Sequence, residues 1–246
     1  MNLNTATMQK LASMKMQGMI NAFQNVLETG QASHLTIDAL LAHIVDSEWD
    51  YRKNRKRERL LKQADFRYHA TFQEIDFQAA RNLDQNLLLR LSDCSFISER
   101  KDLIVTGPTG CGKSFIGSAL GHQACEHGYR TAYFGTSKLL VYLKSERENG
   151  NYLRTLNKLQ KTDLLIIDDF GLNPFDAPNR LALLDILEDR HARKSTMFIS
   201  QLPVSTWHDL IGESTVADAI MDRIAYNSFR IELTGESMRK KYQKTD

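Results

Sequence analysis

One short segment limits the possible fold of this chain more than any other: residues 107–114 read GPTGCGKS, which matches the pattern G-x-x-x-x-G-K-[ST]. The apolar run from Leu103 to Val105 precedes the segment, and a helical stretch begins at Ser114. A strand, a glycine-rich loop and a helix in this order are typical of a phosphate-binding loop (P-loop). We therefore predict a nucleotide site here rather than a glycine-rich turn that only caps a helix.

The residue types in this segment suit the chemistry of phosphate binding. Gly107, Gly110 and Gly112 let the backbone curl, so that successive N–H groups point at phosphate oxygens. The helix that follows adds its positive N-terminal end. Lys113 would place an ammonium on the β- and γ-phosphates, and the Ser114 hydroxyl would ligate Mg²⁺. The predicted nucleotide-binding residues are Gly107, Pro108, Thr109, Gly110, Cys111, Gly112, Lys113 and Ser114.

A second motif ends in two carboxylates. Residues 163–169 read DLLIIDD, which is the pattern of a buried strand followed by an acidic pair. Ligands gather at the carboxyl ends of the strands in a parallel sheet, so Asp168 and Asp169 are expected beside the P-loop. Asp168 is the predicted metal carboxylate, directly or through water, and Asp169 could orient or deprotonate an attacking water. Taken alone, the motif could also be a strand that ends in an acidic turn.

Apolar runs typical of strands alternate with helical stretches in the larger part of the chain. The runs cover residues 103–106, 131–134, 164–167 and 196–199. This alternation predicts an α/β fold in which helices cover both faces of a parallel sheet. Residues before this region read as helical throughout. We therefore expect a small all-helical N-terminal domain over residues 1–70 and a P-loop domain over residues 71–246.

The N-terminal region contains two predicted helices. Apolar residues at intervals of three or four predict one helix face over residues 8–27, which Gly30 ends. These residues are Met8, Ala12, Met16, Met19, Phe23 and Leu27. Thr36 is the predicted cap of a second helix, with Asp38 in its first turn. This helix continues without Gly or Pro into a basic run at residues 52–62, RKNRKRERLLK.

The basic run is the most uneven charge distribution in the chain. The whole sequence has 32 basic and 30 acidic residues, which leaves a net charge of only +2. In the run, charges surround the helix for two turns, so the segment cannot pack against a core. Such a run is typical of a polyanion-binding face, and the alternative is a solvated helix face.

Composition excludes several classes of protein. A hydrophobic fraction of 42%, a charged fraction of 25% and four prolines fit a folded chain of one or two domains. No stretch approaches the roughly 18 apolar residues of a membrane span, and the N-terminus lacks the pattern of a secretory signal. Cys94, Cys111 and Cys125 do not have the spacing of a disulfide framework or a zinc module. We therefore expect a cytoplasmic protein without a membrane partner.

Accessory residues narrow the kind of P-loop protein. Residues 157–160 read NKLQ and lack the aspartate of a guanine reader, and the LSGGQ signature of transporter ATPases does not occur. After the run at 196–199, the side chain of Ser200 or Gln201 could contact the γ-phosphate or the attacking water. A kinase of a small molecule and a nucleotide-binding scaffold without hydrolysis both stay open at this point.

Two arginines near the C-terminus are candidates for a catalytic cation. The segment IMDRI places Arg223 on a helix, and GESMRK places Arg239 near the end of the chain. An arginine presented to a phosphate, from the same or a neighbouring subunit, can raise a hydrolysis rate about 10³–10⁵-fold. Either arginine taken alone is also typical of a surface residue.

These motifs together resemble one family. GPTGCGKS, LLIIDDFG, ISQLP and IMDRI, in this order, resemble the IstB/DnaC group of AAA+ ATPases, and most closely IstB, the ATP-binding helper of insertion-sequence transposition. The N-terminal segments EWDYRKNRKRERLLKQADF and FQEIDF are also similar to IstB. The resemblance spans residues 8–241, and its most discriminating segments are DDFG and EWDYR.

The resemblance implies a fold, cofactors and partners. Such proteins have an N-terminal helical domain and a AAA+ core, bind ATP and Mg²⁺ between subunits of a homo-oligomer on duplex DNA, and activate a transposase. It implies that Gln201 or Ser200 is sensor 1, that Arg223 is an arginine finger acting in trans, and that Arg239 is sensor 2. The catalytic residues expected on this basis are Lys113, Asp168, Asp169, Gln201, Arg223 and Arg239.

One departure from the family pattern concerns catalysis. AAA+ proteins usually have Asp-Glu where this chain has Asp168 and Asp169, and aspartate is one methylene shorter. We therefore expect slow ATP hydrolysis, with ATP acting mainly as an assembly switch.

The resemblance also favours contact between the basic run and DNA. Basic side chains that neutralise phosphates release counterions, which gives salt-dependent binding with little sequence preference. The predicted DNA contacts are Arg52, Lys53, Arg55, Lys56, Arg57 and Arg59. The sequence contains no helix-turn-helix or zinc signature, so we do not expect base-specific readout. The alternative function in the same group is a helicase loader similar to DnaC, which would prefer single-stranded DNA.

Overall fold

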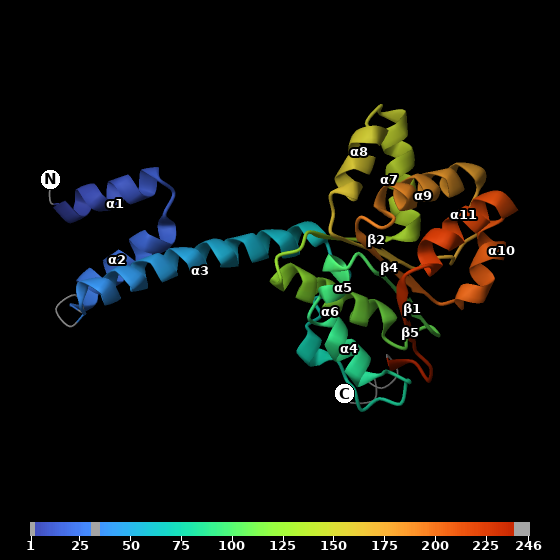
Figure 1. Ribbon diagram of the computed structural model, residues 1–246, viewed down its shortest axis with the longest axis horizontal. Coiled ribbons are helices and arrows are strands. Elements are labelled where there is room, and N and C mark those ends of the chain that lie inside the picture. Colours follow the sequence, from blue (N-terminus) through green and yellow to red (C-terminus); the bar gives the residue numbers. More distant parts are fainter. Residues whose placement is uncertain (1–2, 31–34, 239–246) are drawn as a thin grey trace. The chain divides into compact units, whose positions relative to one another are not determined.

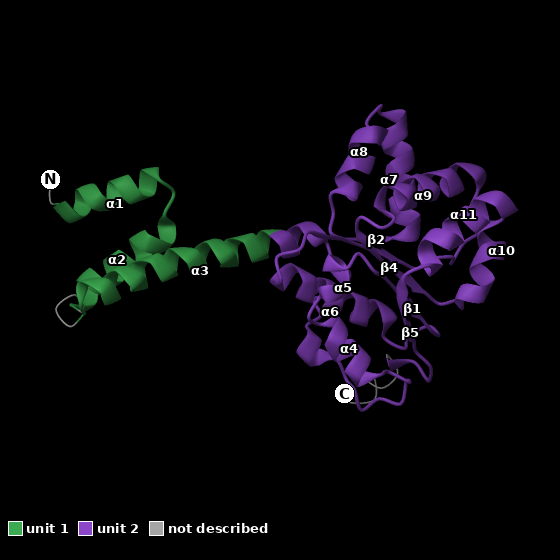
Figure 2. Cartoon of the chain, in the orientation of Figure 1, with its two compact units in different colours: residues 1–59 green, residues 60–246 purple. Residues whose placement is uncertain are grey.

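The computed structural model describes residues 3–30 and 35–238 of the chain. The chain divides into two compact units, residues 1–59 and residues 60–246 (Figure 2). This division lies inside helix α3 (Ile37–Ala64), whereas the sequence pattern predicts a domain boundary near residue 70. Among the described residues, no helix has both the length and the apolar character that a membrane span needs.

Three helices form the first unit: α1 (Leu3–Ser13), α2 (Gln17–Thr29) and the larger part of α3 (Figure 1). Helices α2 and α3 approach closely at Gly18, where a Cβ atom would lie 2.5 Å from the carbonyl oxygen of Ser47. The buried Glu48 of α3 accepts a hydrogen bond from the Met19 N–H at 3.1 Å and pairs with Arg52 at 2.6 Å. The contact between the two helices therefore combines backbone packing with one buried carboxylate.

The apolar stripe over residues 8–27 predicts a single helix, and this prediction is wrong. The chain bends between α1 and α2, where Lys15 has a left-handed φ angle of 58°. The buried side of α2 consists of Gly18, Ile20, Ala22 and Val26. The second predicted helix is confirmed as α3, and the Thr36 hydroxyl accepts a hydrogen bond from the Ala39 N–H at 3.3 Å.

A sheet of five parallel strands forms the centre of the second unit, in the order β2-β3-β4-β1-β5 (Figure 1). The strands are β1 (Asp102–Thr106), β2 (Thr131–Gly135), β3 (Leu164–Asp168), β4 (Ser195–Ser200) and β5 (Ser228–Glu232). The four predicted strands are confirmed. Strand β5 was not predicted, because its sequence SFRIE alternates between apolar and polar residues and lies at the edge of the sheet beside β1.

Helices connect the strands and extend the unit beyond them. They are the 3-10 helices η2 (Phe72–Glu74) and η3 (Val204–Thr206) and the helices α4 (Gln85–Leu91), α5 (Ser95–Ser98), α6 (Lys113–Glu126), α7 (Thr136–Glu148), α8 (Tyr152–Gln160), α9 (Ala177–Arg190), α10 (Trp207–Ile211) and α11 (Ser214–Ala225).

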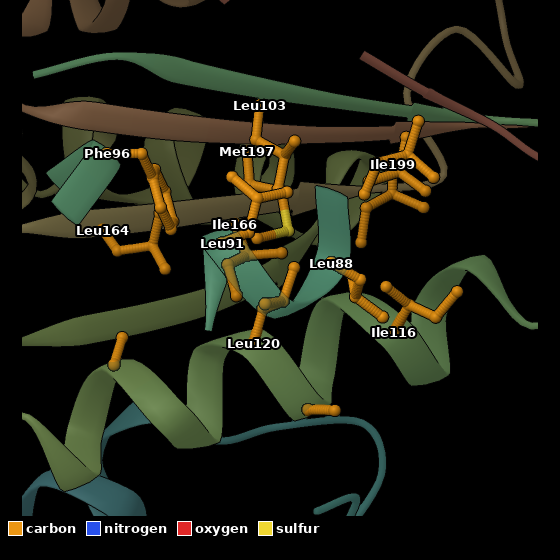
Figure 3. Packing of buried hydrophobic residues seen from close by; sticks show 14 of the residues in the cluster. Leu88, Leu91, Phe96, Leu103, Ile116, Leu120, Leu164, Ile166, Met197 and Ile199 are labelled. Atoms are coloured by element: carbon orange, nitrogen blue, oxygen red, sulfur yellow. The ribbon is translucent and has the colours of Figure 1, made fainter. Parts of the chain in front are cut away.

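Helices cover both faces of the sheet, because successive strand residues point to opposite sides. On one face, strand residues pack against α4, α5 and α6, as Figure 3 shows for Leu103, Ile166, Met197, Leu88, Phe96, Ile116 and Leu120. On the other face, Ile104, Leu165 and Phe198 pack in a cluster with residues of α7 to α11. The predicted α/β fold, with a parallel sheet between two layers of helices and preceded by further helices, is confirmed.

Candidate nucleotide site

The carboxyl ends of three neighbouring strands meet at one edge of the sheet. Strand β4 lies between β1 and β3. The P-loop follows β1, Asp168 ends β3, and Gln201 follows β4. Because all three strands run in the same direction, the P-loop, the acidic pair and Gln201 come together.

The P-loop has a backbone shape that depends on its glycines. Gly110 and Gly112 have φ angles of 84° and 94°, which favour glycine. A Cβ atom at Gly110 would lie 2.1 Å from the Ser237 hydroxyl oxygen, and a Cβ atom at Gly112 would lie 2.4 Å from Arg81 Nη1. A larger residue at either position would push the loop away from its walls.

Lys113 begins helix α6 and turns back towards the loop. Its Nζ donates a hydrogen bond to the carbonyl oxygen of Pro108 at 2.7 Å. Burial lowers the pKa of the Lys113 ammonium, and the charges of Asp168 and Asp169 oppose this effect. An anion bound in the loop would stabilise the charged form that burial disfavours.

Two segments form walls of the P-loop that its motif does not reveal. Arg81 is buried, and its guanidinium donates to the carbonyl oxygens of Cys111 at 3.1 Å and Asp76 at 2.8 Å. The second wall follows β5, where the Met238 N–H donates to the carbonyl oxygen of Gly110 at 2.9 Å. The loop is therefore held by hydrogen bonds from both segments.

A cavity of about 530 Å³ lies against the loop. This volume is in the range of small-molecule sites, about 300–1,000 Å³. Lys113, Ser114 and Asp169 line the cavity together with the aromatic residues Tyr68 and Phe115, whose ring centroids are 6.4 Å apart. The cavity thus combines polar groups suited to phosphates with aromatic rings suited to a base.

Asp168 is buried and makes hydrogen bonds through both carboxylate oxygens. Its Oδ1 accepts from the Asp169 N–H at 2.8 Å. Its Oδ2 accepts from the Tyr133 hydroxyl and from Arg67 Nη1, the latter at 3.2 Å. Burial and the Asp168 charge raise the pKa of Tyr133, so this phenol stays neutral and acts as a donor.

The residues at this place fit a magnesium ion. The Tyr133 hydroxyl donates to the Asp168 carboxylate, and Ser114 lowers the pKa of the same phenol, so a carboxylate and a hydroxyl both lie near Tyr133. Mg²⁺ prefers oxygen ligands and usually takes one or two from protein, with phosphates and waters as the rest. The described residues contain no group of three or more His, Cys, Asp or Glu that could hold a metal.

The two candidates for sensor 1 have different surroundings. The Gln201 side chain lines the cavity and accepts a hydrogen bond from the Thr109 hydroxyl at 2.5 Å. Ser200 is buried, and its hydroxyl donates to the carbonyl oxygen of Phe170 at 2.7 Å and accepts from the Leu202 N–H at 3.1 Å. Of the two, Gln201 is the residue that a ligand in the cavity can contact.

The other predicted site residues lie elsewhere. Arg223 on α11 does not line the cavity of its own chain, and its guanidinium bonds to the Ala219 carbonyl at 2.7 Å and the Glu188 carboxylate at 3.1 Å. Arg239 lies outside the described residues. The predicted DNA contacts all lie on α3 in the first unit, where Arg57 is half-buried and the other five are exposed. These five are Arg52, Lys53, Arg55, Lys56 and Arg59.

Residues of the site that were not predicted from the sequence include Arg67, Tyr68, Arg81 and Tyr133. None belongs to a P-loop or acidic-strand motif. The first three come from the segment between α3 and β1, and Tyr133 comes from β2. A signal for Tyr133 was its position near the carboxyl end of a predicted strand, where ligands gather.

The fold and this site define a class: a P-loop nucleotide-binding protein with a AAA+ core. The model of the IstB-like ATP binding protein family matches residues 9–246, and the chain belongs to this family. The resemblance found in the motifs is thereby confirmed.

Named relatives and solved structures agree with this assignment. An insertion sequence ATP-binding protein of Sinorhizobium fredii is 39% identical over 95% of this chain and 96% of its own length. The ATP-binding protein of an insertion sequence of Pseudomonas fluorescens is 37% identical over 81% of this chain and 87% of its own length. The crystal structures of DnaI and of the DnaC helicase loader match 72% of this chain with TM-scores of 0.58 and 0.52, at 20% and 19% identity. They cover 94% and 99% of those chains and support the fold alone.

Proposed function

We infer that this chain is a Mg²⁺-dependent ATPase that assembles on duplex DNA and helps the transposase of an insertion sequence to select a target. One observation carries the inference: the family match covers both the nucleotide site and the N-terminal unit with the basic run. The relatives at 39% and 37% identity are insertion sequence ATP-binding proteins. The solved helicase loader resembles this chain over a smaller part, and at lower identity.

In this proposal the chain's own residues bind and orient the nucleotide. Lys113 and the N–H groups of the P-loop hold the β- and γ-phosphates, while Ser114 and Asp168 hold Mg²⁺. The ion, when bound, neutralises charge on the phosphate oxygens. Asp169 orients the attacking water and accepts its proton, and Gln201 contacts the γ-phosphate or that water. Because the Asp169 side chain is short, we expect slow turnover.

Hydrolysis in this proposal needs a neighbouring subunit. Arg223 lies away from the cavity of its own chain, and an arginine finger can be supplied by a neighbouring chain. We therefore place the ATP site between subunits of a homo-oligomer, with Arg223 of one chain facing the γ-phosphate on the next. Arg239 remains the proposed sensor 2.

Five exposed basic side chains on α3 make the proposed contact with DNA phosphates, joined by the half-buried Arg57. They contact phosphates and not base edges, so binding should depend strongly on salt and little on sequence.

Binding to labelled duplex and single-stranded DNA, with ATP·Mg²⁺, ADP or no nucleotide and over a range of salt, tests the proposal. We expect tight, ATP-dependent and salt-sensitive binding to duplex, and loss of the ATP dependence in Lys113→Ala. Preference for single strands would favour a helicase loader. A Lys113→Ala protein that assembles normally with ATP, or a wild-type protein without DNA binding in any state, would overturn the proposal.

A pair of double variants tests the basic run by itself. Lys53→Ala with Lys56→Ala removes two exposed charges of α3, and the slope of log affinity against log salt should fall by about 2. The matched control, Arg154→Ala with Lys158→Ala, removes two exposed charges of α8 and should leave the slope unchanged. Equal effects of both double variants would contradict a DNA contact specific to α3.

A further inference from the structure

Arg67 makes a bridge between the two carboxylates of the acidic pair. Its Nη1 lies 3.2 Å from Asp168 Oδ2 and 2.9 Å from Asp169 Oδ2. The Asp168 side chain is 1% exposed, whereas those of Arg67 and Asp169 are 44% and 35% exposed. A single guanidinium nitrogen therefore occupies the space where both carboxylates present oxygen atoms.

The chain holds Arg67 at this place through its neighbours. Asp65 follows α3 with a left-handed φ angle of 53°, which turns the chain at the helix end. The next residue, Phe66, packs against the buried pair Leu60 and Ala64 and makes an edge-on contact with the Tyr133 ring at 6.3 Å. The backbone on the N-terminal side of Arg67 is thus anchored in the core, and only its side chain is free to leave the carboxylates.

The hydrogen bonds of Asp168 show what a metal ion would meet. Oδ2 already accepts from the Tyr133 hydroxyl and from Arg67, and Oδ1 accepts from a backbone N–H. An ion at Oδ2 needs at least one of these donors to move. Tyr133 is buried and neutral, whereas Arg67 is half-exposed and carries a charge of the same sign as the ion. Like charges repel at short distance, so Arg67 is the donor that has to leave.

We propose that Arg67 is a built-in cation of the Asp168–Asp169 pair, which holds these carboxylates in the nucleotide-free protein and must leave them when the magnesium complex of a nucleotide binds. This inference rests on the proposed ATP site and adds a positioning residue to it. Arg67 has two opposite effects on affinity. It competes with Mg²⁺, and it offsets one of the two negative charges of the carboxylates, which would otherwise repel the phosphates of metal-free ATP more strongly.

Because the two effects of Arg67 on affinity are opposite in sign, measurements of nucleotide binding with and without Mg²⁺ test the proposal. Arg67→Gln keeps a polar side chain, although a shorter one, and removes the charge. Titration with a fluorescent ATP analogue, in EDTA and over a series of Mg²⁺ concentrations, measures both affinities. We expect the Mg²⁺ concentration for half-maximal binding to fall several-fold in the variant, and the dissociation constant in EDTA to rise several-fold. Arg67→Lys, which keeps a cation, should stay close to the wild type.

A matched control is Arg147→Gln. Arg67 lies over the Tyr68 ring, and Arg147 likewise lies over a tyrosine ring and beside a carboxylate, at Tyr152 and Asp185. Both affinities should stay unchanged in this control. If Arg67→Gln weakens binding equally with and without Mg²⁺, Arg67 is a phosphate ligand and the proposal is wrong. Two unchanged affinities would also overturn it.

A second measurement separates this proposal from the proposed function. Thermal unfolding with MgCl₂ alone, compared with KCl at equal ionic strength, needs no nucleotide. Arg67→Gln should gain more stabilisation from Mg²⁺ than the wild type, because its carboxylates lack a cation. If the wild type fails to bind ATP under any condition, the ATP site fails, and this comparison still decides the role of Arg67. Equal shifts in both proteins would refute the competition.

Discussion

Ser200 and Gln201 are neighbours with different tasks. The Ser200 hydroxyl joins the backbone of two loops, while the Gln201 amide lines the cavity. We predict that Gln201→Ala keeps ATP binding and thermal stability but lowers the hydrolysis rate roughly a hundredfold, as loss of one transition-state contact does. Phosphate release at saturating ATP measures this effect.

Ser200→Ala is the matched variant on the same strand end. It should lower the free energy of unfolding by about 1–3 kcal/mol, because two buried backbone groups lose their partner. If Ser200→Ala stops hydrolysis without a loss of stability while Gln201→Ala has no effect, the two assignments are reversed.

Asp102 is a buried carboxyl with a direct effect on the pH dependence of stability. Burial raises the pKa of Asp102 to about 7, although the Thr196 N–H and the Arg190 charge favour ionisation. Between its unfolded pKa, about 4, and its folded pKa, the native state binds a proton that the unfolded chain has lost. This contribution to stability is therefore complete at low pH and is lost as the pH rises through 7.

We predict that Asp102→Asn removes this loss. Between pH 5 and pH 8 the wild-type free energy of unfolding should fall by about 2–3 kcal/mol more than that of the variant. Urea titrations at both pH values measure the difference. Asp163→Asn is the control: despite burial, Lys194 and the Arg130 N–H lower the pKa of Asp163, so its contribution should be the same at both pH values. Parallel pH profiles of Asp102→Asn and wild type would contradict the raised pKa.

At the scale of elements, the contact between α2 and α3 depends on one missing side chain. A Cβ atom at Gly18 would lie 2.5 Å from the Ser47 carbonyl oxygen and 2.7 Å from Glu48 Cα, and neither backbone can move cheaply. We predict that Gly18→Ala destabilises the N-terminal helices by about 1–3 kcal/mol, despite the better helix propensity of alanine. Hydrogen exchange of the α2 amides measures this change.

ATP affinity in the same protein should be unaffected, because Gly18 belongs to the first unit. Asn25→Ala, at an exposed position of the same helix, is the control and should leave exchange almost unchanged. Unchanged or slower exchange in Gly18→Ala would show that the two helices accommodate the methyl group, and would contradict this prediction.

Elements were predictable from the sequence where burial makes a continuous pattern. Strands β1, β3 and β4 are almost completely buried and read as apolar runs, for example LLIID in β3. Strands β2 and β5 both lie at an edge of the sheet, but TAYF in β2 still reads as a run, whereas polar residues separate the two apolar residues of SFRIE in β5. The bend at Lys15 was not predicted, because the periodic spacing of apolar residues continues on both sides of this single left-handed residue. Periodicity records which side is apolar but not where a helix is interrupted.

The residues of the site also divide into those that were predictable from the sequence and those that were not. The P-loop and the acidic pair are local motifs, since their chemistry is fixed by neighbouring residues in the chain. Arg67 and Arg81 have no local signal of the site, because their partners in the two motifs, Asp168 and Cys111, are 101 and 30 residues away. Only the fold brings an arginine after α3 to the end of β3. A single sequence gives no reason to choose these two among the other arginines.

At the scale of the whole molecule, the position of Arg223 predicts complementation between chains. Arg223→Ala should bind ATP normally and lose hydrolysis about 10³-fold or more, if the finger acts in trans. Lys113→Ala should lack ATP binding but keep a working Arg223. A mixture of the two inactive proteins on DNA should therefore recover part of the activity, measured as phosphate release.

Glu188→Ala provides the control, because it breaks the ion pair with Arg223 and leaves the arginine in place. It should hydrolyse ATP at close to the wild-type rate. Wild-type activity in Arg223→Ala would show that the finger lies elsewhere. A mixture without recovery, with both variants bound to DNA, would argue against action between subunits.

During protein synthesis the P-loop leaves the ribosome long before residues 233–238, which form one of its walls. A nascent chain therefore carries the complete GPTGCGKS segment while the Gly110 carbonyl still lacks the Met238 N–H. A fragment truncated before Thr234, by a premature stop codon or a protease, would contain the complete P-loop motif but would lack most of the segment that forms one wall of the loop. We therefore expect a fragment that ends before Thr234 to bind nucleotide more weakly than the full chain.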